Sequence, residues 1–156
     1  MSIKKINIAI VGATGYTGLD LVLLLSKHPK ANIVNLSARK HLGKHISFFD
    51  KRIKKKLPKI SSIKKINWIN IDLVFLSLPN GEAQKIVKKI YHKHKKIRFI
   101  DLSADFRITN PNEYEKNYNI RHSAKEFIKN SIYSISEFVK KEIKKFRIIA
   151  NPGCYP

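Results

Sequence analysis

The chain has 156 residues, of which 43% are hydrophobic, and it contains a single cysteine. A chain of this size and composition can bury one domain-sized core, and a single cysteine excludes an internal disulfide. The apolar run near the N-terminus is broken by Asn7 and followed by glycine, so it is too short for a membrane span and does not resemble a signal peptide. We therefore expect a cytoplasmic protein without a membrane partner.

The formal net charge of +21 raises nucleic acid as a partner, because basic chains attract polyanions. The excess comes from 26 lysines against 6 arginines, and it accompanies 24 isoleucines and 12 asparagines. These three abundant residue types share A/T-rich codons, so base composition explains the bias. The lysines are also scattered, without the stacking aromatics of nucleic-acid-binding modules. We therefore predict no specific nucleic-acid partner.

Nearly continuous apolar runs alternate with amphipathic stretches along the chain. In chain order they predict a strand (3–11), a helix (15–27), two strands (31–38 and 71–78), a helix (82–93) and two further strands (97–102 and 146–150). Residues 39–70 are rich in lysine and predict a loop with a short helix or strand. Buried strands separated by helices are typical of a parallel sheet covered on both faces. The predicted fold is therefore a doubly wound α/β domain of the Rossmann type over residues 1–150.

A glycine-rich turn lies between the first strand and the first helix, in the sequence VGATGYTG. Gly12 permits the tight turn, Gly15 lets the backbone approach a pyrophosphate, and Gly18 allows close packing of the helix. The helix N-terminus then offers N–H groups to phosphate oxygens. The predicted cofactor-binding residues in this turn are Gly12, Ala13, Thr14, Gly15, Tyr16, Thr17 and Gly18.

The end of the second strand indicates which dinucleotide binds. An NAD site usually has an acidic residue there for the ribose 2′-hydroxyl, but this chain has none between Asp20 and Asp50. Instead it has Ser37, Arg39 and, next to it, a lysine, and a guanidinium suits a 2′-phosphate. We therefore predict NADP(H) as the cofactor.

Five sequence blocks together resemble one enzyme family. They are VGATGYTG, LSAR, FLSLPNG, DLSADFR and ANPGCYP, and in order and spacing they are similar to the N-terminal half of N-acetyl-gamma-glutamyl-phosphate reductase. The resemblance implies reduction of N-acetyl-glutamyl 5-phosphate by NADPH to the 5-semialdehyde plus phosphate, in arginine biosynthesis. Its substrate would be a small-molecule acyl phosphate. Aspartate-semialdehyde dehydrogenases share the glycine turn, but their cysteine lies in a different local sequence.

The resemblance also assigns roles to residues outside the glycine turn. Cys154 would be the nucleophile that forms a thioester, and Asn151 would help to place the carbonyl or its oxyanion. Ser103 and Arg107 would face the substrate phosphate or the cofactor. The tight turn in FLSLPNG would line the nicotinamide side of the site, through Ser77, Pro79 and Gly81.

The residues themselves leave other interpretations open. Asp101 and Asp105 could simply cap turns and pair with Arg107. His122 matches a family position without an assignable role, and no metal site is predicted. The segment YSISE, with Ser134 and Ser136, departs from the glycine and proline that the family commonly has there.

The family enzyme is longer than this chain and has a second, substrate-binding domain. Residues 151–156 would be the start of its catalytic segment, and the complete enzyme would be a homo-oligomer. Two interpretations therefore stay open: the N-terminal half of an active reductase, with the short chain inactive alone, or a non-catalytic NADP-binding remnant of a truncated gene. A lysine-pathway relative that reduces a longer, carrier-bound acyl phosphate has similar N-terminal motifs.

Overall fold

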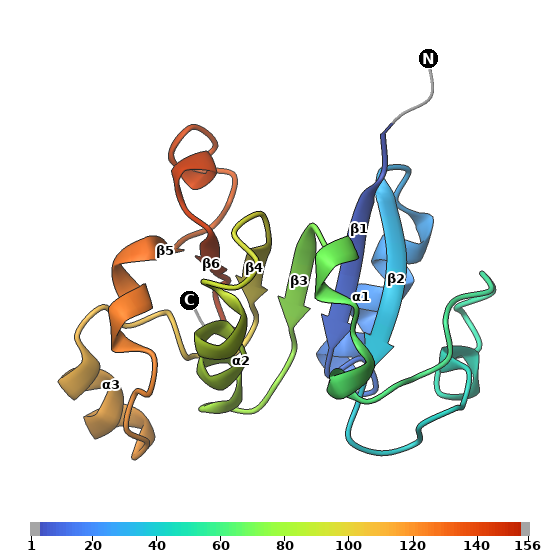
Figure 1. Ribbon diagram of the computed structural model, residues 1–156, viewed down its shortest axis with the longest axis horizontal. Coiled ribbons are helices and arrows are strands. Elements are labelled where there is room, and N and C mark those ends of the chain that lie inside the picture. The colour runs from blue at the N-terminus through green and yellow to red at the C-terminus, as the bar shows by residue number, and fades with distance from the viewer. Residues whose placement is uncertain (1–3, 154–156) are drawn as a thin grey trace. The chain divides into compact units, whose positions relative to one another are not determined.

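The computed structural model describes residues 4–153. They form two compact units, of which the first ends at Ser77 and the second begins at Leu78. Both units contain parallel strands connected by helices (Figure 1). Within residues 4–153, no helix is long and apolar enough to cross a membrane.

The first unit is built on three parallel strands in the order β2-β1-β3. Their bounds are β1 Ile6–Val11, β2 Ala31–Ser37 and β3 Leu73–Leu76. The central strand β1 pairs with a neighbour on each edge and ends in four buried residues, as is typical of a parallel strand covered on both faces. All three strands therefore deliver their carboxyl ends to the same edge of the sheet, where the glycine-rich turn begins.

The helix α1, Tyr16–Lys27, connects β1 to β2 and packs against both strands. In Figure 1 it lies behind the strands, and its inward face buries Gly18 and Val22. The helix ends at Lys27 with His28 as its C-cap, and the next residue is Pro29, which has no N–H to continue the hydrogen-bond ladder. The observed helix starts one residue later than predicted, because Gly15 is its N-cap.

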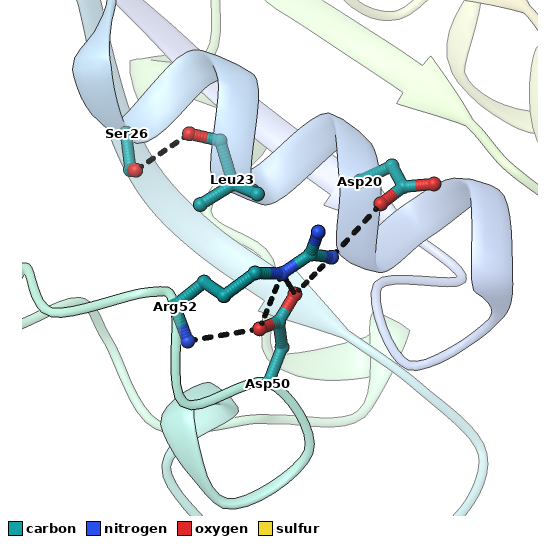
Figure 2. A network of polar contacts seen from close by, with 5 residues as sticks. All are labelled: Asp20, Leu23, Ser26, Asp50 and Arg52. Atoms are coloured by element: carbon teal, nitrogen blue, oxygen red, sulfur yellow. Dashed lines mark hydrogen bonds and ion pairs between the residues drawn. The ribbon is translucent and has the colours of Figure 1, made fainter.

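The long connection from β2 to β3 contains three short 3₁₀ turns, η1 Ile46–Phe48, η2 Ile63–Lys65 and η3 Trp68–Asn70. Buried apolar side chains, among them Ile53 and Ile60, anchor it to the first unit. Figure 2 shows a polar anchor as well: Arg52 binds Asp50 at 2.8 Å and Asp20 of α1 at 3.2 Å. Hydrogen bonds from Arg52 lower the pKa of Asp50. The prediction of a loop with a short helix or strand is thus confirmed in its helical form, as a loop with three 3₁₀ segments, and the loop is tied to α1 by Arg52.

The second unit has its own three parallel strands, in the order β4-β6-β5. They are β4 Arg98–Asp101, β5 Ser131–Tyr133 and β6 Ile148–Ala150. The helices are α2 Glu82–Ile90 and α3 Pro111–Tyr118, and the 3₁₀ segments are η4 Lys125–Asn130 and η5 Glu142–Lys145. The helix α2 buries Ala83, Val87 and Ile90. Its end is held by Arg147, which donates to the carbonyl groups of Tyr91, His94 and Ile97.

The predicted doubly wound parallel α/β fold is confirmed, and every predicted strand and helix is present with shorter ends. Residue 3, the predicted start of the first strand, lies outside the described residues. One strand and one α-helix were missed, β5 and α3, together with the 3₁₀ segments η4 and η5. β5 has three residues, and α3 buries only Tyr114, so neither has a hydrophobic period that a sequence pattern can detect.

Candidate functional site

The glycine-rich turn closes tightly at the carboxyl end of β1. Gly12 has φ of 87°, a left-handed conformation that favours glycine. Its N–H and that of Ala13 both donate to the carbonyl oxygen of Ser37, at 2.9 and 3.1 Å, and the N–H of Gly15 donates to Gly12 at 3.2 Å. The role predicted for Gly12 in the turn is therefore supported by its backbone conformation.

The other two glycines of the turn, Gly15 and Gly18, differ in whether the fold has room for a side chain at their positions. A Cβ added at Gly18 would lie 2.2 Å from the carbonyl oxygen of Gly12, which is backbone and cannot move aside. A Cβ at Gly15 would meet that same oxygen at 3.6 Å, an ordinary contact, and φ of −75° at Gly15 suits any residue. Packing therefore requires glycine at position 18, and nothing within the described residues requires it at position 15.

The N-terminus of α1 is open toward a ligand. No side chain caps it, its first turn has no acidic residue, and its first helical hydrogen bond starts at the N–H of Leu19. Tyr16 is 95% exposed, Thr17 is exposed and Thr14 is half-buried. Backbone N–H groups at an uncapped helix N-terminus fit a phosphate group, and the space above Gly15 lets it approach. The residues present therefore fit a dinucleotide pyrophosphate.

At the end of β2, Ser37 and Arg39 have different environments. Ser37 is 1% exposed and its hydroxyl donates to the carbonyl oxygen of Ser61 at 3.2 Å. The side chain of Ser37 is thus committed to holding residue 61 beside β2, which corrects the expectation that it faces a 2′-phosphate. Arg39 lies just beyond the strand and is exposed.

The residues of the predicted nicotinamide turn fall in two units. Ser77, in the first unit, donates its N–H to Val11 at 2.9 Å. In the second unit, Pro79 is exposed and Gly81 is the N-cap of α2, with φ of 86°. The N–H of Gly81 donates to the carboxylate of Asp105 at 2.6 Å. The turn that contains Gly81 is therefore fixed by a residue 24 positions later.

Asp101 organises the loop after β4. It is fully buried and accepts from the hydroxyl of Ser103 at 2.6 Å, from the N–H of Ser103 at 2.9 Å and from the N–H of Phe106 at 3.1 Å. Burial raises the pKa of Asp101 to about 6, although the Ser103 hydroxyl works in the opposite direction. Ser103 is 5% exposed and also accepts from the N–H of Asp105, so both of its neighbours in this network are aspartates of the same loop.

Arg107 lies against the segment that leads to the cysteine. Its Nε donates to the carbonyl oxygen of Asn151 at 2.9 Å and an Nη donates to Leu102 at 3.2 Å. A Cβ added at Gly153 would lie 2.8 Å from an Nη of Arg107. The N–H of Asn151 donates to the carbonyl oxygen of Asp101 at 2.8 Å. Residues 101–107 therefore hold residues 151–153, whereas Cys154 lies outside the described residues.

The predicted pairing of the two aspartates with Arg107 is wrong, although their capping role is confirmed. The carboxylate of Asp101 caps its own loop, and that of Asp105 accepts from the N–H groups of Gly81 and Gln84. The hydrogen bonds of the Arg107 guanidinium go to carbonyl groups.

A buried polar network around Asp105 was not recognised from the sequence. Tyr114 is fully buried and its hydroxyl donates to Asp105 at 2.6 Å. Gln84 is 1% exposed; its side chain donates to the Tyr114 hydroxyl at 3.3 Å and accepts from the N–H of Ser123. Burial and the neighbouring Asp105 raise the pKa of Tyr114. The only sequence signal for this network is a polar residue, Gln84, on the apolar face of a helix.

His122 completes this network as a neutral side chain. It is 2% exposed, its Nε2 lies 2.7 Å from the carbonyl oxygen of Asp105, and its Nδ1 accepts from the N–H of Ala124 at 3.2 Å. Since Nδ1 accepts, the ring proton is on Nε2 and is donated to Asp105. Burial lowers the pKa of His122, against the opposing effect of its hydrogen bond to Asp105. His122, without an assigned role in the sequence, therefore holds the loop of Asp105.

Residues 7–146 match the family described as "Semialdehyde dehydrogenase, NAD binding domain". The chain belongs to this family. The matched residues include the glycine-rich turn, the Gly81 turn and the loop of Asp101 and Asp105, and such a domain binds a nicotinamide dinucleotide.

Two curated relatives are named as N-acetyl-gamma-glutamyl-phosphate reductases. The chain is 40% identical over 154 residues to the probable chloroplastic enzyme of Arabidopsis thaliana, covering 98% of this chain and 38% of the relative. It is 42% identical over 153 residues to the N-acetyl-gamma-glutamyl-phosphate reductase of Alkaliphilus metalliredigens, covering 97% of this chain and 44% of the relative. The predicted resemblance is thereby confirmed. The chain spans 36–44% of the length of the curated relatives that it matches.

Solved structures of semialdehyde dehydrogenases have the same fold. Aspartate semialdehyde dehydrogenase II from Vibrio cholerae has a TM-score of 0.64 at 20% identity, covering 96% of this chain and 38% of that one. The Candida albicans enzyme, solved with NADP, has a TM-score of 0.58 at 18% identity, covering 94% and 42%. Among the described residues of this family member, no group of three or more His, Cys, Asp or Glu side chains could hold a metal ion.

The environment of His122 predicts a loss of stability in acid. Because the pKa of His122 is lowered from 6.5 in the folded chain, the unfolded chain binds more protons below that pH, and stability falls as pH falls. The charges of Asp105 and Glu126 oppose this effect and that of Lys125 adds to it, but burial is the largest cause. His122→Gln, which cannot titrate, should flatten this part of the profile. Melting temperatures measured between about pH 7.5 and pH 5 check it.

The wild-type chain should start with the higher melting temperature, and its advantage over the variant should shrink toward acid. The difference between the two melting temperatures at each pH removes the effect of Asp101, which titrates in both proteins. Because the pKa of Asp101 is raised in the folded chain, its titration stabilises the fold toward acid, opposite to that of His122. An advantage that stays constant or grows toward pH 5 would contradict a neutral, hydrogen-bonded His122.

Proposed function

We propose that this chain is the NADP-binding part of an enzyme that reduces an acyl phosphate to an aldehyde through a cysteine thioester. The observation that carries the proposal is the loop of Asp101–Arg107 lying between two other segments: its aspartate side chain binds the Gly81 turn, and its backbone and arginine bind Asn151. A cofactor turn and a cysteine-bearing segment are thus attached to one loop of the second unit.

The uncapped N-terminus of α1 indicates which residues would bind the cofactor. The N–H groups at the start of α1, with Ala13, Thr14, Tyr16 and Thr17, bind the pyrophosphate beside Gly15. Arg39 binds a 2′-phosphate, and the absence of an acidic residue between Asp20 and Asp50 removes the repulsion that would disfavour it. Ser77, Pro79 and Gly81 line the nicotinamide end. When bound, NADPH supplies a hydride.

The covalent chemistry belongs to Cys154. Its thiolate attacks the carbonyl carbon of the acyl phosphate, the bond from carbon to the phosphate oxygen breaks, and phosphate leaves. The thioester that remains accepts a hydride more readily than a carboxylate does, and the aldehyde departs as the thiolate returns. Asn151 is exposed and orients the carbonyl oxygen, while the positive charge of Arg107 beside residue 153 attracts the phosphate. Ser103 supports this loop through Asp101.

The substrate that we propose is N-acetyl-glutamyl 5-phosphate, in arginine biosynthesis. The support is the name shared by the relatives at 38–42% identity, N-acetyl-gamma-glutamyl-phosphate reductase. We propose further that the complete enzyme is a homo-oligomer of the cytoplasm that acts on small molecules.

A pair of glycine variants separates phosphate binding from packing. Gly15→Val should weaken NADP(H) binding by about tenfold or more, since a side chain blocks the pyrophosphate, with little change in melting temperature. Gly18→Ala should destabilise the chain by about 1–3 kcal/mol, because its Cβ overlaps the Gly12 carbonyl. Calorimetry and thermal denaturation of both variants measure the two effects. Undiminished cofactor binding by folded Gly15→Val would show that this turn is not a phosphate cradle.

The cofactor preference depends on Arg39. The wild-type chain should bind NADP(H) more tightly than NAD(H), and Arg39→Asp should remove or reverse the preference, because a carboxylate repels a 2′-phosphate and binds a 2′-hydroxyl. Lys30→Asp makes the same change of charge at the opposite end of β2 and serves as the control. Titration calorimetry with both cofactors checks this. Equal affinity of the wild-type chain for NADP(H) and NAD(H) would refute the assignment.

The nucleophile is tested in the protein expressed from the complete gene. Cys154→Ser should abolish reductase activity while NADP(H) still binds, because a hydroxyl is a far weaker nucleophile than a thiolate. In the wild-type protein from the complete gene, the Cys154 thiol should react with iodoacetamide at neutral pH faster than a model thiol. In the 156-residue chain alone, Cys154 should react as an ordinary thiol, and no turnover should be seen. Full activity of the serine variant, or turnover by the short chain, would be incompatible with this mechanism.

A further inference from the structure

Asp105 is a buried carboxylate that binds backbone far away in sequence. It is fully buried, and its two oxygens accept from the N–H of Gly81 at 2.6 Å and from the N–H of Gln84 at 2.9 Å. A buried carboxylate is costly to desolvate unless its oxygens accept strong hydrogen bonds. Asp105 therefore occupies this place because the start of α2 provides those donors.

These contacts make Asp105 the cap of α2. The N-cap residue of this helix is Gly81, which has no side chain, and no cap hydrogen bond comes from within the helix segment. Asp105 takes the place of an N-cap side chain, and its charge is favourable beside the positive end of the helix dipole. Without it, two backbone N–H groups of the turn would be buried without this acceptor.

Asp105 is itself held by two other side chains. Tyr114 donates a hydroxyl to the same oxygen that binds Gly81, and His122 donates to the backbone carbonyl of Asp105. Gln84 connects the Tyr114 hydroxyl to the N–H of Ser123. A carboxylate with this many fixed partners has little freedom to move, so it fixes the position of whatever it binds.

The loop of Asp105 reaches the cysteine-bearing segment as well. Two residues after Asp105, Arg107 donates to the carbonyl of Asn151, and four residues before it, Asp101 accepts from the N–H of Asn151. A displacement of this loop would therefore move the Gly81 turn and residues 151–153 together, within the second unit.

We propose that Asp105 is a positioning residue that holds the Gly81 turn in the conformation that binds the nicotinamide half of the cofactor. The proposal rests on the proposed function, in which Pro79 and Gly81 line the nicotinamide end. It assigns to Asp105 no contact with cofactor or substrate. Its effect passes through the two N–H groups that it binds.

The test compares two ligands that differ by the nicotinamide half. NADP⁺ contains that half, and adenosine 2′,5′-bisphosphate lacks it but keeps the 2′-phosphate that Arg39 is proposed to bind. Asp105→Asn replaces one accepting oxygen with an NH₂ group that cannot accept from Gly81 or Gln84. The turn then has to be ordered on binding, so NADP⁺ affinity should fall by about tenfold, while the affinity for the bisphosphate stays unchanged. Titration calorimetry on the 156-residue chain measures both.

A second pair of variants protects the test against misfolding of Asp105→Asn. Tyr114→Phe removes one hydrogen bond to Asp105 and should weaken NADP⁺ selectively by a smaller factor, whereas Tyr118→Phe removes a hydroxyl from the neighbouring ring, 4.9 Å away between centroids, and should change neither ligand. Amide hydrogen exchange of Gly81 and Gln84 should become faster in Asp105→Asn and Tyr114→Phe only.

The outcomes are distinct. If the wild-type chain binds neither ligand, the proposed function fails and this inference fails with it. If the wild-type chain binds both, while Asp105→Asn and Tyr114→Phe weaken both ligands equally or weaken neither, the cofactor site stands and the positioning role of Asp105 is overturned. A loss confined to NADP⁺ supports it.

Discussion

The need to satisfy buried N–H groups at the start of α2 is the constraint on which the second unit depends. Gly81 takes a left-handed conformation at this point and cannot supply a capping side chain, so the acceptor comes from Asp105. Burying that carboxylate requires further donors, which Tyr114 provides, and a fixed backbone, which His122 provides. The backbone of one turn is thus linked to the side chains of Asp105, Tyr114 and His122.

The same loop contains a second buried carboxylate, and the two are not equivalent. The carboxylate of Asp101 accepts hydrogen bonds from residues of its own loop. Burial raises the pKa of Asp101 to about 6, and the charge of Asp105 adds to the effect. The carboxylate of Asp105 accepts hydrogen bonds from the N–H groups of Gly81 and Gln84, in a different segment. One aspartate therefore shapes the loop, and the other attaches the loop to the Gly81 turn.

The parts of the fold that could be predicted are those set by neighbours in sequence. The strands other than β5, the two longer helices and the roles of Gly12 and Gly18 depend on local apolar runs and turns, which the sequence displays directly. Ser37, Tyr114 and His122 were misjudged or missed because their partners are distant in sequence. Ser37 binds a carbonyl 24 residues on, and Gln84 binds an N–H 39 residues on, separations that no local pattern records.

Some glycines of this chain are required by the fold itself, and at least one is not, and this difference bears on function. At positions 12, 18 and 81 the chain itself requires it, through a positive φ or through backbone that a Cβ would overlap. Gly153 faces Arg107 at a distance where a side chain would displace the guanidinium from Asn151. Gly15 alone among these has an unstrained backbone and room for a Cβ. The fold does not require glycine at this uncapped helix N-terminus, and the proposed pyrophosphate ligand, which needs the space, is what would require it.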